Sequence, residues 1–186
     1  MPAEQTQYQV RFDWGVGGAR AIGQGADVVV LVDVLGVDAD RTVLPTQVEA
    51  VRPGATVVAG SLRNRSAVAR WALGRQADKG DRFTVAVVAA GSVRSDGSSR
   101  FALENLLGAG AIIDALAEVG IDYCSPEAAA AAAAFTGLAN ATGHLVGAST
   151  SGRALAESGA RGTIDWAIDL DASDDVDVLR EFSFGS

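Results

Sequence analysis

One run of residues, 27–35 with the sequence DVVVLVDVL, restricts the fold of this chain more than any other feature of its sequence. Its apolar residues follow one another almost without interruption, instead of alternating with polar residues. A strand that is apolar on both faces is typical of a parallel sheet that helices cover on both sides. The run therefore predicts a strand in the interior of an α/β sheet.

Other apolar segments extend this pattern, because predicted strands alternate with predicted helices along the chain. Further strands are predicted over 8–14, 55–59, 83–90 and 176–184, and helices over 64–74, 101–119, 152–158 and 163–170. This alternation predicts an α/β fold with a mostly parallel sheet and helices on both faces. Since no linker or repeat divides the sequence, we expect a single α/β domain over residues 1–186.

Charge and composition argue against several classes of function. The formal net charge is −8 at pH 7, and a surface of that sign repels the phosphate backbone, so we expect no nucleic-acid partner. No apolar run approaches the roughly 20 residues of a membrane span, and residues 1–9 lack the apolar core of a signal peptide. We therefore expect a cytoplasmic protein with no membrane partner.

Ligands of parallel α/β sheets bind beyond the carboxyl ends of the strands. Four polar segments follow predicted strands or helix ends in this way, and they are 33–40, 60–66, 90–100 and 149–152. Candidate functional residues are therefore sought in these four segments and at the start of the helix that follows the third of them.

Two acidic residues are candidate metal ligands. Asp33 lies at the end of the apolar run, where an unpaired charge would be costly, so we expect it to have a partner. Hard cations such as Mg²⁺ take carboxylate oxygens, although an Asp here could equally cap the next turn. Glu104 lies at the start of the predicted helix 101–119, where it could bind a metal or only complement the helix dipole at the surface.

Residues 61–66, SLRNRS, follow a predicted strand and enter a helix. Backbone N–H groups at a helix start, together with Arg side chains, can bind an anion. The same segment could also be only a capped helix start, with Ser66 as the cap. The polar segment 91–100 adds two further candidates for anion binding, Ser92 and Arg100.

Three other patterns carry less weight. The glycine-rich residues 15–19, GVGGA, follow a strand as a dinucleotide-binding turn would, but the stretch before the next strand is too short for a good crossover helix. Cys124, the single cysteine, is expected to be a small buried side chain. His144 has no second ligand at a useful spacing, so we expect no zinc site.

Several segments together resemble the 2-phosphosulfolactate phosphatase family. They are RFDWG at 11–15, the run 27–35, residues 60–69 and 91–114, and SGRAL at 151–155, with Gly159 and Asp165 following. The most specific segment is the block 96–110, in which DGS is followed by Glu104 and then by Gly-Ala-Gly. The matches come in the family's order and span most of the chain.

This resemblance implies a Mg²⁺-dependent α/β phosphatase of the coenzyme M route. Its substrate would be a small phosphorylated and sulfonated acid, which it would hydrolyse to sulfolactate and phosphate. Asp33 and Glu104 would be the catalytic residues and the Mg²⁺ ligands, with Arg63 or Arg100 on the sulfonate or carboxylate end of the substrate. The full set of substrate-binding residues would be Ser61, Arg63, Asn64, Ser92 and Arg100.

A second hypothesis is a catalytically weakened or inactive relative that binds a small anion or serves as an assembly subunit. It rests on departures from the family's pattern. A middle segment is absent between Thr42 and Gly60, and the strand end at Leu35 is followed by GVDAD at 36–40 where the family usually has an Arg or Ser and a Thr-rich helix start. Asn105 also follows Glu104 where relatives commonly have Asp, and Ser92 stands where some relatives have an acidic residue. The alanine-rich stretch 127–135 could pack against a second copy of the chain, so a homodimer is the oligomer to test.

Overall fold

Five strands form one sheet in the computed structural model, which describes residues 5–36, 43–93 and 99–182. In spatial order the strands are β1 (Val10–Trp14), β4 (Val85–Ala89), β2 (Val28–Val32), β3 (Thr56–Gly60) and β7 (Val178–Arg180). The first four run parallel, and only β7 pairs antiparallel with its neighbour β3. The prediction of an α/β fold with a mostly parallel sheet is confirmed.

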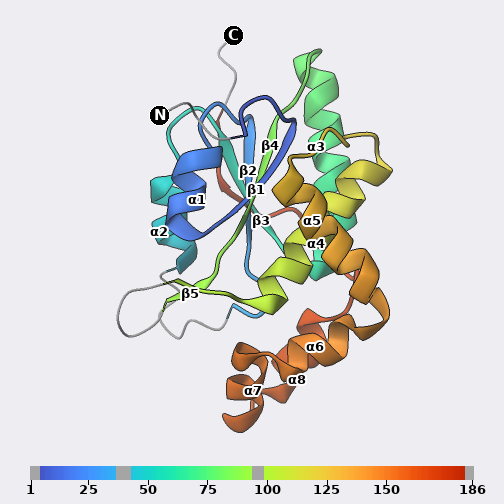
Figure 1. The fold of residues 1–186 in the computed structure, drawn as a ribbon. Helices are drawn as coiled ribbons and strands as arrows, with labels where there is room; N and C mark the ends of the chain where they lie inside the picture. Colours follow the sequence, from blue (N-terminus) through green and yellow to red (C-terminus); the bar gives the residue numbers. More distant parts are fainter. Residues whose placement is uncertain (1–4, 37–42, 94–98, 183–186) are drawn as a thin grey trace.

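Helices cover both faces of the sheet (Figure 1). One face carries α1 (Gly15–Ile22) and α2 (Val43–Ala50), and the other carries α3 (Arg65–Lys79), α4 (Leu103–Glu118) and α5 (Pro126–Leu138). Every residue of β2 is buried. Val29 and Leu31 lie in the apolar layer beneath α1 and α2, while Val28, Val30 and Val32 lie in the layer beneath α3, α4 and α5. This two-sided burial explains why the strand is apolar throughout.

Two glycines let α4 approach its neighbours closely. A Cβ atom on Gly108 would lie 2.5 Å from Val34 Cγ2, at the end of β2. A Cβ on Gly110 would collide with the carbonyl oxygen of Ala131 on α5. The Gly-Ala-Gly block therefore has a packing role, because α4 is pressed between the sheet and α5.

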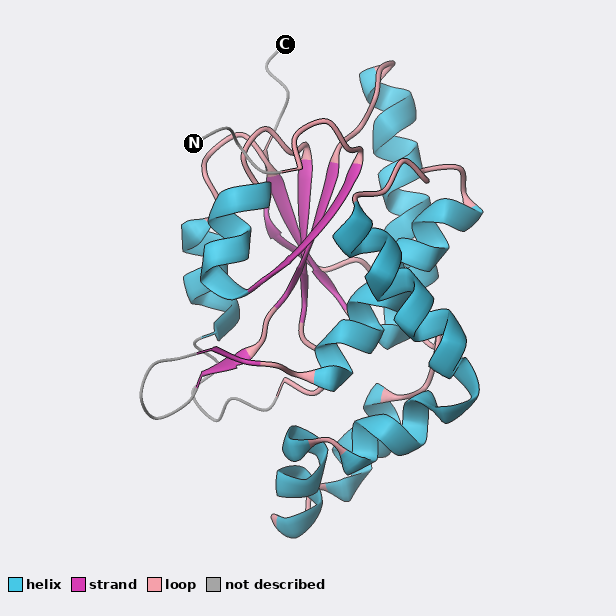
Figure 2. Cartoon of the chain, viewed as in Figure 1, coloured by secondary structure: helices cyan, strands magenta, loops and turns pink. Residues whose placement is uncertain are grey.

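Three short helices form a lobe beyond the carboxyl ends of the strands, as Figures 1 and 2 show. This helical lobe consists of α6 (Thr142–Ala148), α7 (Thr150–Glu157) and α8 (Arg161–Ala167). Its apolar residues, among them Val146 and Ile164, belong to the same core as α3, α4 and α5. A Cβ on Gly152 would collide with Val146 O, so this glycine allows α7 to lie against α6.

The glycine-rich stretch after β1 forms only a short helix, α1, of eight residues. Local structure differs from expectation in two places. The helix α3 starts at Arg65, so Ser66 lies inside it and is not its cap. The ends of the segment 91–100 pair as β5 (Ser92–Val93) and β6 (Ser99–Arg100). Within the described ranges, no helix has the length and apolar character needed to cross a membrane.

Candidate functional site

The start of α4 lies against the end of β2. Asn105, which is 3% exposed, accepts a hydrogen bond from the backbone N–H of Val34 at 2.9 Å through its Oδ1 atom. The amide oxygen supplies the acceptor that a carboxylate would supply at this position, so the Asn in place of Asp retains this contact. This hydrogen bond holds the start of α4 against the segment that follows β2, at the carboxyl edge of the sheet.

Glu104 is the most unusual residue at this edge. Its side chain is 2% exposed, and its Oε2 atom has no hydrogen-bond partner among the residues that the structure describes. Glu104 precedes Gly108 by four residues, so both lie on the face of α4 that meets the end of β2. A buried carboxylate oxygen without a partner costs free energy. It therefore calls for a cation or a donor that the described residues do not supply.

Asp33 follows β2 and is partly exposed. Its Oδ1 atom accepts a hydrogen bond from the backbone N–H of Gly36 at 3.1 Å, as expected of a residue that caps a turn. Strand alternation places Asp33 on the α1 and α2 side of the sheet, since Leu31 lies in that layer. Glu104 approaches from the α4 side, so the sharing of one metal ion by Asp33 and Glu104 stays a prediction.

A pocket of about 190 Å³ lies at the ends of β1 and β4. This edge pocket is lined by Trp14, Gly15, Ala90, Gly91, Arg100 and Phe101. The rings of Trp14 and Phe101 lie 5.3 Å apart between centroids, so two aromatic side chains and Arg100 line the same pocket. Arg100 Nη2 also donates a hydrogen bond to Ser151 Oγ, on α7 of the helical lobe, at 3.0 Å. The structure thus joins two of the four segments selected from the sequence.

The segment 61–66 makes its contacts within the protein. Asn64 and Ser61 form a capping box, in which Asn64 Oδ1 accepts from the N–H of Ser61 at 2.9 Å. Arg63 Nη1 donates to the carbonyl oxygen of Trp166 at 2.7 Å and lies 3.5 Å from a carboxylate oxygen of Asp169. Its guanidinium carbon also stacks 4.1 Å from the centre of the Trp166 ring. A substrate role for Ser61, Arg63 and Asn64 stays a prediction, and any such role would compete with these contacts.

A carboxylate of the protein itself occupies the start of α3. Asp171 accepts a hydrogen bond from the N–H of Ser66 at 2.9 Å and another from Arg65 Nε at 2.9 Å. Arg65 also pairs with Asp114 of α4 at 3.1 Å. Partial burial acts to raise the pKa of Asp171, but the hydrogen bonds from Ser66 and Arg65 and the charge of Arg65 outweigh it. The pKa of Asp171 is therefore lowered, and the carboxylate stands where a bound anion would.

Replacing Asp171 by Asn is expected to flatten the loss of stability in acid. Because the folded-state pKa lies below the ordinary 3.8, the ionised carboxylate stabilises the fold above that value and loses this effect as the pH falls through the folded pKa. Urea unfolding between about pH 6 and pH 2 should show a shallower acid decline for Asp171→Asn than for the natural protein. Asp174→Asn, at a side chain that is 93% exposed, is the control and should retain the natural decline. Parallel profiles for all three proteins would contradict this role of Asp171.

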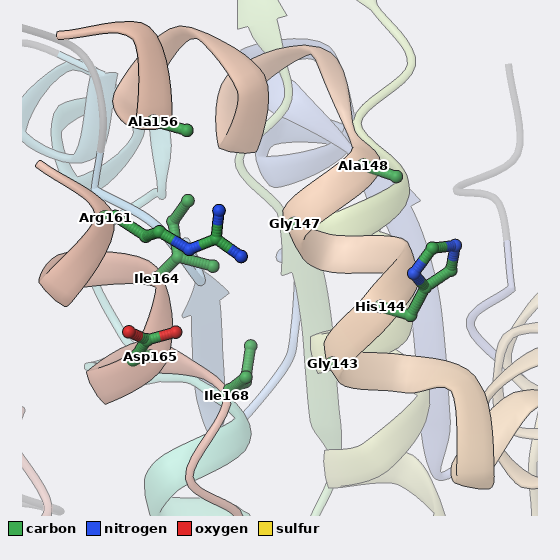
Figure 3. Close-up of a pocket in the computed structure, with 9 residues that line it drawn as sticks. All are labelled: Gly143, His144, Gly147, Ala148, Ala156, Arg161, Ile164, Asp165 and Ile168. Carbon is green, nitrogen blue, oxygen red and sulfur yellow. The ribbon is translucent and has the colours of Figure 1, made fainter. Parts of the chain in front are cut away.

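A larger pocket, of about 360 Å³, lies inside the helical lobe between α6 and α8 (Figure 3). Gly143 and Gly147 leave one wall without side chains, and Arg161 extends from α8 toward them (Figure 3). His144 also lines this pocket and is exposed. None of the predicted site residues lines this pocket, so we place the candidate site at the strand ends.

One functional candidate has no signal in the sequence. Gln47, a polar residue in the apolar helix α2, is 1% exposed and donates from Nε2 to the carbonyl oxygen of Ala90 at 2.7 Å. Its Oε1 atom is buried with no partner among the described residues. The amide cannot be reversed, because Ala90 O can only accept. Only the tertiary structure reveals that Gln47 reaches the end of β4, where the edge pocket begins.

Glu104 and Asp33, the two candidate carboxylate ligands at this edge, suit a cation that also binds water and substrate. Within the described ranges, no three His, Cys, Asp or Glu residues gather into a metal site. Magnesium does not require such a cluster, because it commonly binds one or two carboxylates and completes its shell with water and substrate phosphate. The unpartnered Oε2 atom of Glu104 fits that role, with Asp33 as the second candidate ligand. The side chain of Ser92 and all of Asp96 lie outside the described part of the structure.

The comparison with protein families gives a match to the family described as 2-phosphosulpholactate phosphatase, over residues 42–181 of the 186. The match contains Arg63, Arg100, Glu104 and Ser151, and it begins after Asp33. A search of the curated proteins found no match. The match covers most of the chain and includes every helix from α2 onward. The chain therefore belongs to the 2-phosphosulfolactate phosphatase family.

Proposed function

We propose that this protein is a Mg²⁺-dependent phosphatase that hydrolyses 2-phosphosulfolactate to sulfolactate and phosphate. The observation that carries the proposal is the buried, unpartnered carboxylate oxygen of Glu104 at the carboxyl edge of the sheet. In a chain of this family, a carboxylate oxygen kept there with no partner among the described residues is explained by a cation bound during function. The family assignment supports the phosphatase activity.

Each group at the edge has a distinct task in this proposal. Glu104, with Asp33 as the second ligand, would hold Mg²⁺. The ion would neutralise phosphoryl oxygens and orient the ester. Water adds to phosphorus while the ester P–O bond breaks, and the leaving oxygen takes a proton to become the hydroxyl group of sulfolactate. The rigid attachment of α4 to β2, through Asn105 and Gly108, would keep Glu104 in place for this task.

Local cations must attract this substrate, because the protein carries a formal net charge of −8 and the substrate is itself an anion. Arg63 and Arg65 are paired with Asp169 and with Asp171 and Asp114. Arg100 lines the edge pocket at the strand ends and also donates to the hydroxyl of Ser151. We favour Arg100 for contact with the substrate because it lines this pocket.

Phosphate release from 2-phosphosulfolactate is expected to require Mg²⁺. A colorimetric assay of inorganic phosphate should show turnover with Mg²⁺, loss of turnover in excess EDTA, and recovery when Mg²⁺ is added back. Equal release in EDTA would contradict a metal-dependent mechanism. Absence of release under all conditions would contradict the phosphatase proposal as a whole.

Melting temperatures measured on the same protein preparation distinguish the proposal from the hypothesis of an inactive anion-binding relative. A ligand that binds only the folded state raises the melting temperature, and the stabilisation grows with the logarithm of the ratio of ligand concentration to Kd. Stabilisation by sulfolactate and Mg²⁺ without any turnover of 2-phosphosulfolactate would favour the inactive relative. Stabilisation together with turnover is the expected result.

A further inference from the structure

Arg100 is held between two parts of the chain that are distant in sequence. Arg100 is the last residue of β6, in the segment that follows β4, while Ser151 lies in the first turn of α7. The 3.0 Å hydrogen bond from Arg100 Nη2 to Ser151 Oγ spans 51 positions of sequence. The guanidinium group therefore has its position set from the helical lobe as well as from the sheet.

Ser151 retains the capacity to donate a hydrogen bond of its own. A serine hydroxyl is one donor and two acceptors, and its described contact uses it only as an acceptor from Arg100. Ser151 is partly exposed, so its hydroxyl can meet a ligand. It also lies at the start of α7, where the positive end of the helix dipole favours negative charge. An anion beside Arg100 could thus receive hydrogen bonds from both side chains.

The packing of the lobe fixes where Ser151 stands. Ser149 caps α7 by accepting a hydrogen bond from the N–H of Gly152 at 3.0 Å. Gly152 lies directly against α6 at Val146, and Val146 is fully buried in the main core. Ser151 lies between these two anchored residues, so the packing of the lobe fixes its backbone beside Arg100, and the side chain needs only one rotamer to reach it.

The edge pocket suits the acid end of the substrate better than its phosphoryl group. Arg100 can bind an anion directly, whereas the carboxylate of Glu104 repels an anion unless a cation lies between them. At about 190 Å³ the pocket is smaller than typical pockets for drug-sized ligands. The lining of the pocket is mostly apolar, so a compact sulfonate or carboxylate would lie at its Arg100 side, with the phosphoryl group toward Glu104.

We propose that Arg100 and Ser151 together form the subsite for the sulfonate or carboxylate end of the substrate, and that the helical lobe completes the active site by holding Arg100 through Ser151. This inference rests on the proposed function. Arg100 would contact the substrate. Ser151 would both position Arg100 and donate to the same anion, so the lobe would determine specificity for substrates that have an acid group besides the phosphoryl group.

The test compares two substrates in the natural protein and in Ser151→Ala. The variant should raise KM for 2-phosphosulfolactate about tenfold, as expected for loss of one hydrogen bond to a charged group. KM for p-nitrophenyl phosphate, which has no second acid group, should change by less than about twofold, because that substrate does not use the subsite. Ser158→Ala is the matched control at the C-terminal end of the same helix, since the described contact of its hydroxyl is donation to Leu155 O.

The difference between the KM changes for the two substrates distinguishes a role of Ser151 in substrate binding from a merely structural role. An equal rise in KM for both substrates, or no rise for either, would overturn the inference. Calorimetric titration with sulfolactate in the absence of metal tests it without turnover, and Ser151→Ala should bind about tenfold more weakly than the natural protein. If no phosphoester is hydrolysed but this difference in affinity appears, the proposed function fails while the subsite stands. Equal affinity would remove the subsite whatever the activity.

A pair of arginine variants locates the subsite. Arg100→Gln should abolish detectable sulfolactate binding, because it removes the charge that lines the edge pocket. Arg63→Gln should leave the affinity within about twofold but lower the melting temperature, since Arg63 joins α3 to Trp166 and Asp169. The reverse pattern would assign the acid end of the substrate to Arg63 and would overturn the inference.

Discussion

Glu104→Gln is expected to lower Mg²⁺-dependent phosphate release at least about 100-fold, which corresponds to roughly 2.7 kcal/mol of lost transition-state stabilisation. Glutamine has almost the same shape but no charge, so the side chain would no longer hold a divalent cation. The same change should leave the metal-free fold at least as stable as the natural protein, because it removes a buried carboxylate that has no described partner for Oε2. A functional residue of this kind decreases the stability of the empty fold.

Two measurements on each protein test this expectation: phosphate release, and the melting temperature with and without Mg²⁺. The matched control is Glu127→Gln, because Glu127 is the second residue of α5 as Glu104 is of α4, but it is exposed. The control should retain activity and its response to Mg²⁺. Full Mg²⁺-dependent activity in Glu104→Gln would contradict the assignment. A large loss of metal-free stability would show that Glu104 has a structural role instead.

Gly110→Ala is expected to destabilise the fold by about 3 kcal/mol, the upper part of the usual range for overpacking. The added Cβ would collide with the carbonyl oxygen of Ala131, which belongs to the backbone of α5 and cannot rotate away. For a chain of this size the melting temperature should fall by roughly 6–12 °C. Thermal unfolding followed by circular dichroism measures this change.

Gly137→Ala provides a control of opposite sign. Gly137 lies in α5, as does the Ala131 that Gly110 contacts, but nothing stands within 4 Å of an added Cβ. Alanine should therefore stabilise the helix by roughly 0.5–1 kcal/mol, because it restricts the unfolded chain more than glycine does. If both variants change stability in the same direction, the close contact of α4 with α5 is not what requires glycine at position 110.

Features with a local physical cause were predictable from the sequence. The run 27–35 predicts a strand buried on both faces, and β2 is such a strand. Successive residues of a strand point to opposite faces, so an uninterrupted apolar run gives apolar side chains to both faces. The helix expected over 101–119 is present as α4. Glu104 was recognisable as a candidate because an acid at a helix start beyond a buried strand has few possible roles. Its burial without a described partner for Oε2 was not recognisable, since that depends on how α4 packs.

The long-range pairings were decided by the tertiary structure alone. Sequence patterns could not choose between Arg63 and Arg100, because both follow strands and both are cations. In the folded chain, Arg63 is bound at Trp166 and Asp169, and the start of α3 is covered by Asp171, while Arg100 meets Ser151 at the edge pocket. Such contacts depend on strand order and on the position of the helical lobe. The spacing of residues in the sequence does not predict strand order or the position of the lobe. Each pairing joins charges or hydrogen-bonding groups that lie many tens of positions apart.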